Sequence, residues 1–94
     1  MEIKLEFNSD TFGLAGFPYG EEIFNEQILP KISDFEESDM ITIVFPPQIE
    51  RVASSFVQGL FNGFFDTFKV EWVENNIAIK AATDDLAKDI QQKV

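Results

Sequence analysis

The polar residues best placed for a binding role follow an apolar stretch in the middle of the chain. Arg51, Ser55, Gln58 and Asn62 recur at intervals of three and four residues, which places them on one face of a helix. Ser54 precedes Ser55 at the start of this pattern. Because guanidinium, hydroxyl and amide groups all form hydrogen bonds, the stripe predicts a surface for contact with another protein.

A second row on the same predicted helix consists of small residues. Ser55, Gly59 and Gly63 lie four residues apart, and a glycine inside a helix costs about 1 kcal/mol relative to alanine. Close packing offsets that cost, either on the protein's own sheet or last helix, or against a partner seated in a groove. The candidate partner-binding residues are therefore Arg51, Ser54, Ser55, Gln58, Gly59, Asn62 and Gly63.

The residue types that most catalytic sites need are missing. The sequence has no cysteine and no histidine, which removes the thiol nucleophile, the commonest general base and the commonest transition-metal ligand. Glu36, Glu37 and Asp39 cluster, but residues 33–39 contain no glycine for the bend of a calcium loop. We expect no enzyme activity, no catalytic residues, no metal and no cofactor.

Charge and length restrict the partner classes. The chain has 94 residues, 45% of them hydrophobic, and a net charge of −10, so we expect one domain over residues 1–94. Ten acids and two lysines lie in residues 1–47. This acidity confers solubility, repels nucleic acid and anionic membranes, and suits a basic protein partner. With no apolar run near the ~20 residues of a membrane span and no signal-peptide pattern, we expect a cytoplasmic protein.

The first half of the chain alternates between strand and helix patterns. Residues 2–7 alternate apolar and polar positions, as a half-exposed strand does. Residues 12–17 fit a short strand or a loop, and residues 20–29 fit a helix that ends or kinks at Pro30. Residues 40–45 are apolar apart from Thr42, which predicts a buried strand covered on both faces.

The second half continues this alternation. A helix is expected to begin at Pro47, or later with Ser54 as its N-cap, and to reach Phe65. Two alternating runs, 68–73 and 77–81, then flank an asparagine pair and predict a β-hairpin. A last helix follows, capped by Thr83. The predicted fold class is α/β, a single small domain with a mixed sheet of about four strands and three helices in the order β-α-β-α-β-β-α.

The central residues also form a recognisable combination: a glycine before the first helix, a buried strand, and a serine pair ahead of an apolar helix. This combination resembles STAS-like domains, relatives of the anti-sigma-factor antagonist domains, over roughly residues 12–66. The matching positions are Gly20, the strand 41–45, Ile49, Val52, Ser54, Ser55, Phe56 and Leu60.

The resemblance implies a mixed sheet packed with helices and a regulatory protein-interaction role, often with a kinase-like ATPase. In the antagonists, phosphorylation of a serine in an Asp-Ser-Ser-Gly motif breaks partner binding, so Ser54 and Ser55 become candidate phosphorylation sites. Ala53 and Phe56 replace the motif's acid and glycine, and Phe45 replaces the acid usual at the end of the strand. Without phosphorylation, Ser54 would cap the helix and Ser55 would lie on its polar face.

Two functions follow as hypotheses. The first is a non-enzymatic, regulatory protein-interaction module that acts through the helix after the central strand. The second is a small acidic inhibitor, of the anti-CRISPR-like or nucleic-acid-mimicking kind that phages encode, which blocks a basic site on a nucleic-acid-binding protein. The acidic surface of that alternative would include Glu36, Glu37 and Asp39.

Overall fold

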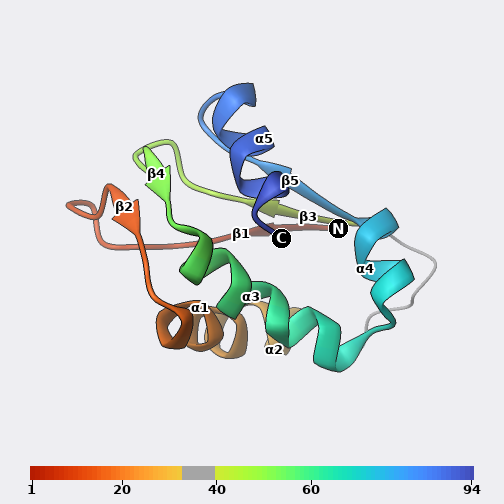
Figure 1. Ribbon diagram of the computed structural model, residues 1–94. Helices are drawn as coiled ribbons and strands as arrows, with labels where there is room; N and C mark the ends of the chain where they lie inside the picture. The colour runs from red at the N-terminus through yellow and green to blue at the C-terminus, as the bar shows by residue number, and fades with distance from the viewer. Residues whose placement is uncertain (33–39) are drawn as a thin grey trace.

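The computed structural model describes residues 1–32 and 40–94 and shows a small α/β domain with parallel strands. Helical segments and strands alternate along most of the chain (Figure 1). In chain order the elements are β1 (Glu2–Lys4), β2 (Gly13–Leu14), α1 (Phe17–Ile23), the π-helical turn η1 (Phe24–Ile28), α2 (Leu29–Ile32), β3 (Ile41–Val44), β4 (Arg51–Val52), α3 (Ser54–Thr67), α4 (Val70–Asn76), β5 (Ile77–Lys80) and α5 (Asp84–Gln92).

The three-stranded sheet has the order β1-β3-β5, and both pairs of strands are parallel. The prediction of an interior strand at 40–45 is confirmed, because β3 lies between the other two and Ile41, Ile43 and Phe45 are all buried. A second, two-stranded parallel sheet joins β2 to β4. The predicted mixed sheet is wrong for the described strands, all of which pair in parallel.

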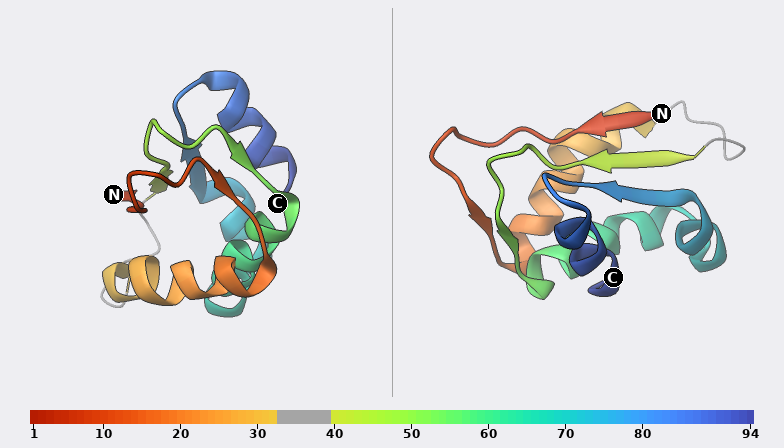
Figure 2. Two further views of the ribbon diagram at one scale, coloured as in Figure 1. Left: turned by 90° about the vertical axis from the view of Figure 1, so that its left-hand side faces the viewer. Right: turned by 90° about the horizontal axis from the view of Figure 1, so that it is seen from above.

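The helices cover the sheet unevenly. The α1–η1–α2 segment and α3 lie side by side against one face of the sheet, and α5 lies beside β5 (Figure 2). Seen from above, no helix of the described chain lies over the opposite face of β1 and β3 (Figure 2). Thr42 and Val44 point to that side and are only half-buried. The expectation that both faces of the central strand are covered is therefore wrong.

The first helix is longer than its sequence pattern indicates. It begins at Phe17 behind Gly16, whose φ of 101° favours glycine, and it continues through Pro30 to Ile32. Pro30 has no N–H to donate one helical turn back. The chain adopts a π-helical turn just before it, in which the N–H of Leu29 bonds to the carbonyl of Phe24. This wider turn lets the helix continue past the proline.

The predicted β-hairpin over 68–81 is wrong, because its first half is the helix α4. Apolar residues there also recur four apart, and Phe68 stacks on Trp72 with ring centroids 4.4 Å apart. The side-chain amide of Asn76 donates to the carbonyl of Trp72 at 3.0 Å, a bond along the helix. A parallel pairing of β5 with β3 needs a crossover connection, and α3 and α4 provide it.

The cap of the last helix is confirmed. The hydroxyl oxygen of Thr83 accepts the N–H of Leu86 at 3.1 Å, which satisfies one of the unpaired donors at the helix start. We expect Thr83→Ala to lower the free energy of unfolding by about 1 kcal/mol, while Thr83→Ser keeps the hydroxyl and most of that stability. Urea denaturation of both variants measures this, and equal losses would show that the hydroxyl does not stabilise α5.

Candidate functional site

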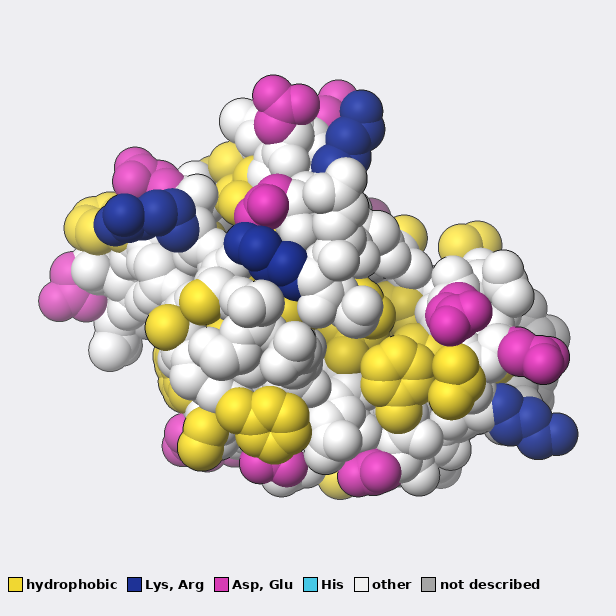
Figure 3. Space-filling view, in the orientation of Figure 1, with side chains coloured by type: hydrophobic (Ala, Val, Ile, Leu, Met, Phe, Trp, Pro, Cys, Tyr) yellow, Lys and Arg dark blue, Asp and Glu magenta, His cyan; other side chains and the backbone are white. Residues whose placement is uncertain are grey.

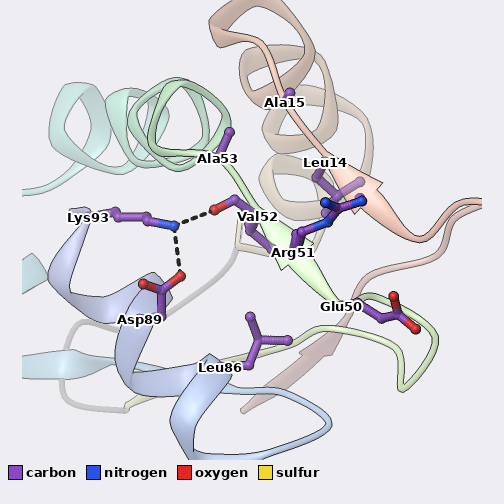
Figure 4. Close-up of a pocket in the computed structure, with 10 residues that line it drawn as sticks. Leu14, Ala15, Glu50, Arg51, Val52, Ala53, Leu86, Asp89 and Lys93 are labelled. Carbon is purple, nitrogen blue, oxygen red and sulfur yellow. Dashed lines mark hydrogen bonds and ion pairs between the residues drawn. The ribbon is translucent and has the colours of Figure 1, made fainter.

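A concave site lies between the two-stranded sheet and α5. It is a cavity of about 460 Å³, with apolar side chains at its base and charged groups around its rim (Figure 4). Strand β4 forms one wall and α5 the facing wall. The residues that line it are Gly13, Leu14, Ala15, Glu50, Arg51, Val52, Ala53, Leu86, Asp89 and Lys93.

Lys93 closes one side of this cavity. Its ammonium group donates to the carbonyl of Val52 at 2.8 Å and pairs with the carboxylate of Asp89 at 2.7 Å (Figure 4). The side chain thereby joins α5 to β4 across the cavity. Asp89 and Lys93 are four residues apart, a spacing from which an ion pair along a helix can be predicted. Nothing in the sequence indicates that Lys93 also reaches β4.

The rim of the cavity carries charges of both signs. Arg51 on β4 and Glu50 just before it are exposed. Asp89 on α5 and Lys93 at the C-cap of that helix line the facing wall. Figure 3 shows basic and acidic side chains side by side over these two elements, with apolar atoms between them. An apolar base below a polar rim is the usual form of a site that takes an apolar side chain and orients it by hydrogen bonds.

The structure divides the predicted polar stripe between the surface and the interior. Arg51 lines the cavity, and Ser54 and Gln58 are exposed on the first turns of α3. Ser55 is half-buried, and its hydroxyl accepts the N–H of Gly16 at 3.0 Å. Asn62 is half-buried too, and its amide donates to a carboxylate oxygen of Glu21 at 3.4 Å. These two residues therefore hold α3 to the first helix and the loop before it.

The predicted start of this helix needs correction. Residues 46–50 form a turn rather than a helix beginning at Pro47. Ala53, with ψ of 151°, occupies the N-cap position, and no side chain caps the helix. Ser54 is the first helical residue instead of the cap, so its hydroxyl is not used there.

The two glycines of α3 face the protein's own first helix. Gly59 is buried, and a Cβ built on it would overlap the backbone carbonyl of Phe17. A Cβ on Gly63 would overlap the ring of Phe24. Of the two explanations for the glycine row, the structure supports internal packing and contradicts a groove that admits a partner. The packing partner is α1, however, and not the sheet or the last helix.

Tyr19 lies on α1 with its phenol partly buried near two carboxylates. Burial raises the pKa of its phenol, and the carboxylates of Glu22 and Glu26 raise it further. The phenol therefore stays protonated and neutral at physiological pH. Its ring packs against Phe56 at a centroid distance of 5.5 Å, so the residue packs against the core and does not line the cavity.

The acidic residues of the alternative hypothesis, Glu36, Glu37 and Asp39, lie outside the described residues. Within residues 1–32 and 40–94, acidic side chains do not gather in groups of three or more that could hold a metal ion. None of the helices described is both long and apolar enough to span a bilayer.

The chain matches no protein-family model, no curated protein and no solved structure.

Proposed function

We propose that this protein is a non-enzymatic, regulatory protein-interaction module of the STAS-like type. The partner-binding surface consists of Arg51, Ser54 and Gln58 together with the adjoining cavity. We name this set the α3 surface. Arg51 and Ala53 line the cavity, and Ser54 follows Ala53 directly. The observation that carries the proposal is this continuity between exposed polar groups and a concave apolar site.

The chemistry of the α3 surface suits a protein partner. Leu14, Val52 and Leu86 offer apolar area to one projecting side chain, and interfaces gain most of their affinity from such buried anchors. Arg51 at the cavity and Gln58, one helical turn after Ser54 on α3, are exposed and supply donors that fix the orientation of the partner. A kinase-like ATPase, which the STAS-like resemblance implies, is the partner class that we propose.

Ser54 is the better candidate for a phosphorylation switch. It is exposed, whereas the hydroxyl of Ser55 is half-buried and bonded to the N–H of Gly16. A phosphate on the first residue of a helix interacts favourably with the helix dipole, so phosphorylation at Ser54 preserves α3. It also places about −2 charges on the partner surface, which breaks contacts made there by acidic groups of the partner.

The test locates the contact before it measures affinity. A photo-crosslinking amino acid at position 54 should capture a partner in the native host, and the same probe at Glu74, exposed on α4, should not. With the partner purified, Ser54→Arg and Arg51→Glu should each weaken binding at least tenfold, about 1.4 kcal/mol. Glu74→Arg is the matched control and should leave the affinity unchanged.

Thermal melts accompany these measurements, and all three variants should melt within a few degrees of the wild type because each site is exposed. Unchanged affinity in both Ser54→Arg and Arg51→Glu would reject the α3 surface as the binding site.

The acidic-inhibitor hypothesis remains as a second candidate, and one observation favours it. Among the described residues, Lys93 and Asp89 form the one ion pair, so most of the 17 acids are available to a basic target. Binding by a nucleic-acid mimic weakens steeply as salt rises. Under that mechanism, replacing Glu36, Glu37 and Asp39 together by glutamine or asparagine abolishes binding, and the α3 variants have little effect.

A further inference from the structure

β1 is an edge strand whose outward backbone groups are open over a short window. Among the described strands it pairs only with β3, through bonds that include the N–H of Thr42 to the carbonyl of Met1 and the N–H of Leu5 to the carbonyl of Val44. Backbone groups of successive strand residues point to opposite sides. Glu2, Lys4 and Glu6 therefore direct their N–H and carbonyl groups away from β3.

The side chain of Gln27 closes this edge at Glu6. Its carbonyl oxygen accepts the N–H of Glu6 at 2.7 Å, and its amide nitrogen donates to the carbonyl of Glu6 at 2.8 Å. The amide group thus takes the place of a neighbouring strand. No described residue forms the corresponding bonds with Glu2 or Lys4. As far as residues 1–32 and 40–94 are concerned, the edge is open at Glu2 and Lys4 and closed at Glu6.

A hollow and an uncovered face of the sheet adjoin this window. A hollow of about 230 Å³ lies beside the edge, between Lys4 and Glu6 on one side and Gln27 and Pro30 on the other. The helix passes beneath the sheet, and β1 forms the sheet's outer margin (Figure 2). The side chains of Glu2 and Lys4 are exposed on the uncovered face, so in a joined sheet they point away from the helices.

We propose that two copies of this chain associate through antiparallel pairing of their β1 edges about Ile3. In that register Glu2 of each copy lies opposite Lys4 of the other, and each such pair exchanges two backbone hydrogen bonds. Opposite charges then face each other twice on the outer side of the joined sheet. Parallel pairing, or an antiparallel shift of two residues, places like charges opposite each other.

A short, charged edge strand ordinarily resists association with another strand. The order Glu-Ile-Lys removes this obstacle in the proposed register, because each glutamate there faces a lysine. The proposal does not depend on the α3 surface, so a failure of one leaves the other standing.

Sedimentation equilibrium from about 10 µM to about 1 mM covers the range expected for so short an interface, with any purification tag placed at the carboxyl end. The wild type should show a reversible monomer–dimer equilibrium. Glu2→Lys and Lys4→Glu should each raise the dissociation constant at least about tenfold. Glu2→Lys lowers the net negative charge, so general repulsion between copies predicts the opposite change for that variant.

Mixing the two single variants supplies the decisive measurement. Glu2→Lys presents two lysines and Lys4→Glu two glutamates, so an equimolar mixture should dimerise at least as tightly as the wild type. The double variant, with both charges exchanged, should also dimerise. A wild type that stays monomeric at every concentration, or a mixture that associates no better than its components, overturns the proposal.

Discussion

Phe56→Ala should lower the free energy of unfolding by about 3–5 kcal/mol, whereas Phe12→Ala should change it by less than about 1 kcal/mol. Phe56 has no exposed surface, and its ring packs against Tyr19 and Phe7 at centroid distances of 5.5 and 6.4 Å. Removing that ring loses its transfer free energy and leaves a cavity that α3 and its neighbours fill only in part. Phe12 is 53% exposed, so the same substitution there removes little buried area.

Urea denaturation measures both changes, and the paired design separates burial from loss of an aromatic residue as such. Leu60→Ala, at another position with no exposed surface, should cost about 2–5 kcal/mol. Domains of this kind are stable by only about 5–15 kcal/mol, so either core variant brings the protein close to unfolding at 37 °C. Losses below about 1 kcal/mol for Phe56→Ala, or equal losses for Phe56→Ala and Phe12→Ala, would contradict the core described above.

The parts of the fold that were predicted correctly have sequence patterns that are compatible with a single type of secondary structure. Residues 40–45 combine β-branched side chains with a following proline pair, and no helix is built from such a short, interrupted run. Thr83 followed by two acids is an N-terminal signature whose hydrogen bond depends only on local geometry. Local chemistry determines both features, so the sequence alone is sufficient for them.

The hairpin was wrong because residues 68–77 satisfy two periods at once. They alternate apolar and charged side chains, as a strand does. Phe68 and Trp72, and likewise Val73 and Ile77, are also four residues apart, the spacing of neighbours on one face of a helix. The sheet decides between strand and helix for these residues, because β5 pairs in parallel with the side of β3 that β1 does not occupy. A parallel partner cannot arrive through a tight turn, so this long-range pairing requires α4.

The candidate site was predicted only in part for a similar reason. Ser54 lies on the helix, as its pattern predicts, but Arg51 lies on β4 rather than on the helix. The cavity beside them also needs Leu86 from α5 and Lys93 at its C-cap. No spacing in the sequence relates α5 to β4. The stripe itself misled because Ser55 and Asn62 are polar and yet face α1, which shows that polarity alone does not identify the outer face of a helix.

Helices α1 and α3 meet through their glycines, and this contact leads to the second large prediction. A Cβ on Gly20 would overlap the backbone carbonyl of Phe56, and one on Gly59 would overlap that of Phe17. Each glycine thus lies against the main chain of the opposite helix. A main-chain carbonyl cannot rotate away as a flexible side chain can, so any added atom forces the two helices apart.

Gly59→Ala should therefore lower the free energy of unfolding by at least about 2 kcal/mol, even though alanine is the better helix former by about 1 kcal/mol. The matched control is Gly13→Ala, where the nearest atom to an added Cβ is the Arg51 carbonyl oxygen at an ordinary 3.8 Å. We expect that variant to match the wild type or to gain up to about 1 kcal/mol, since glycine weakens a strand.

Urea denaturation of the two alanine variants decides between the two roles of the glycine row. If Gly59→Ala is stabilising, as helix propensity alone predicts, then α1 and α3 do not meet as described and Gly59 is open to a partner. If it is destabilising while Gly13→Ala is not, the cost of these glycines in the helix is offset by contact between α1 and α3. Any loss of partner binding in Gly59→Ala then results from unfolding, and should disappear at a temperature low enough for the variant to remain folded.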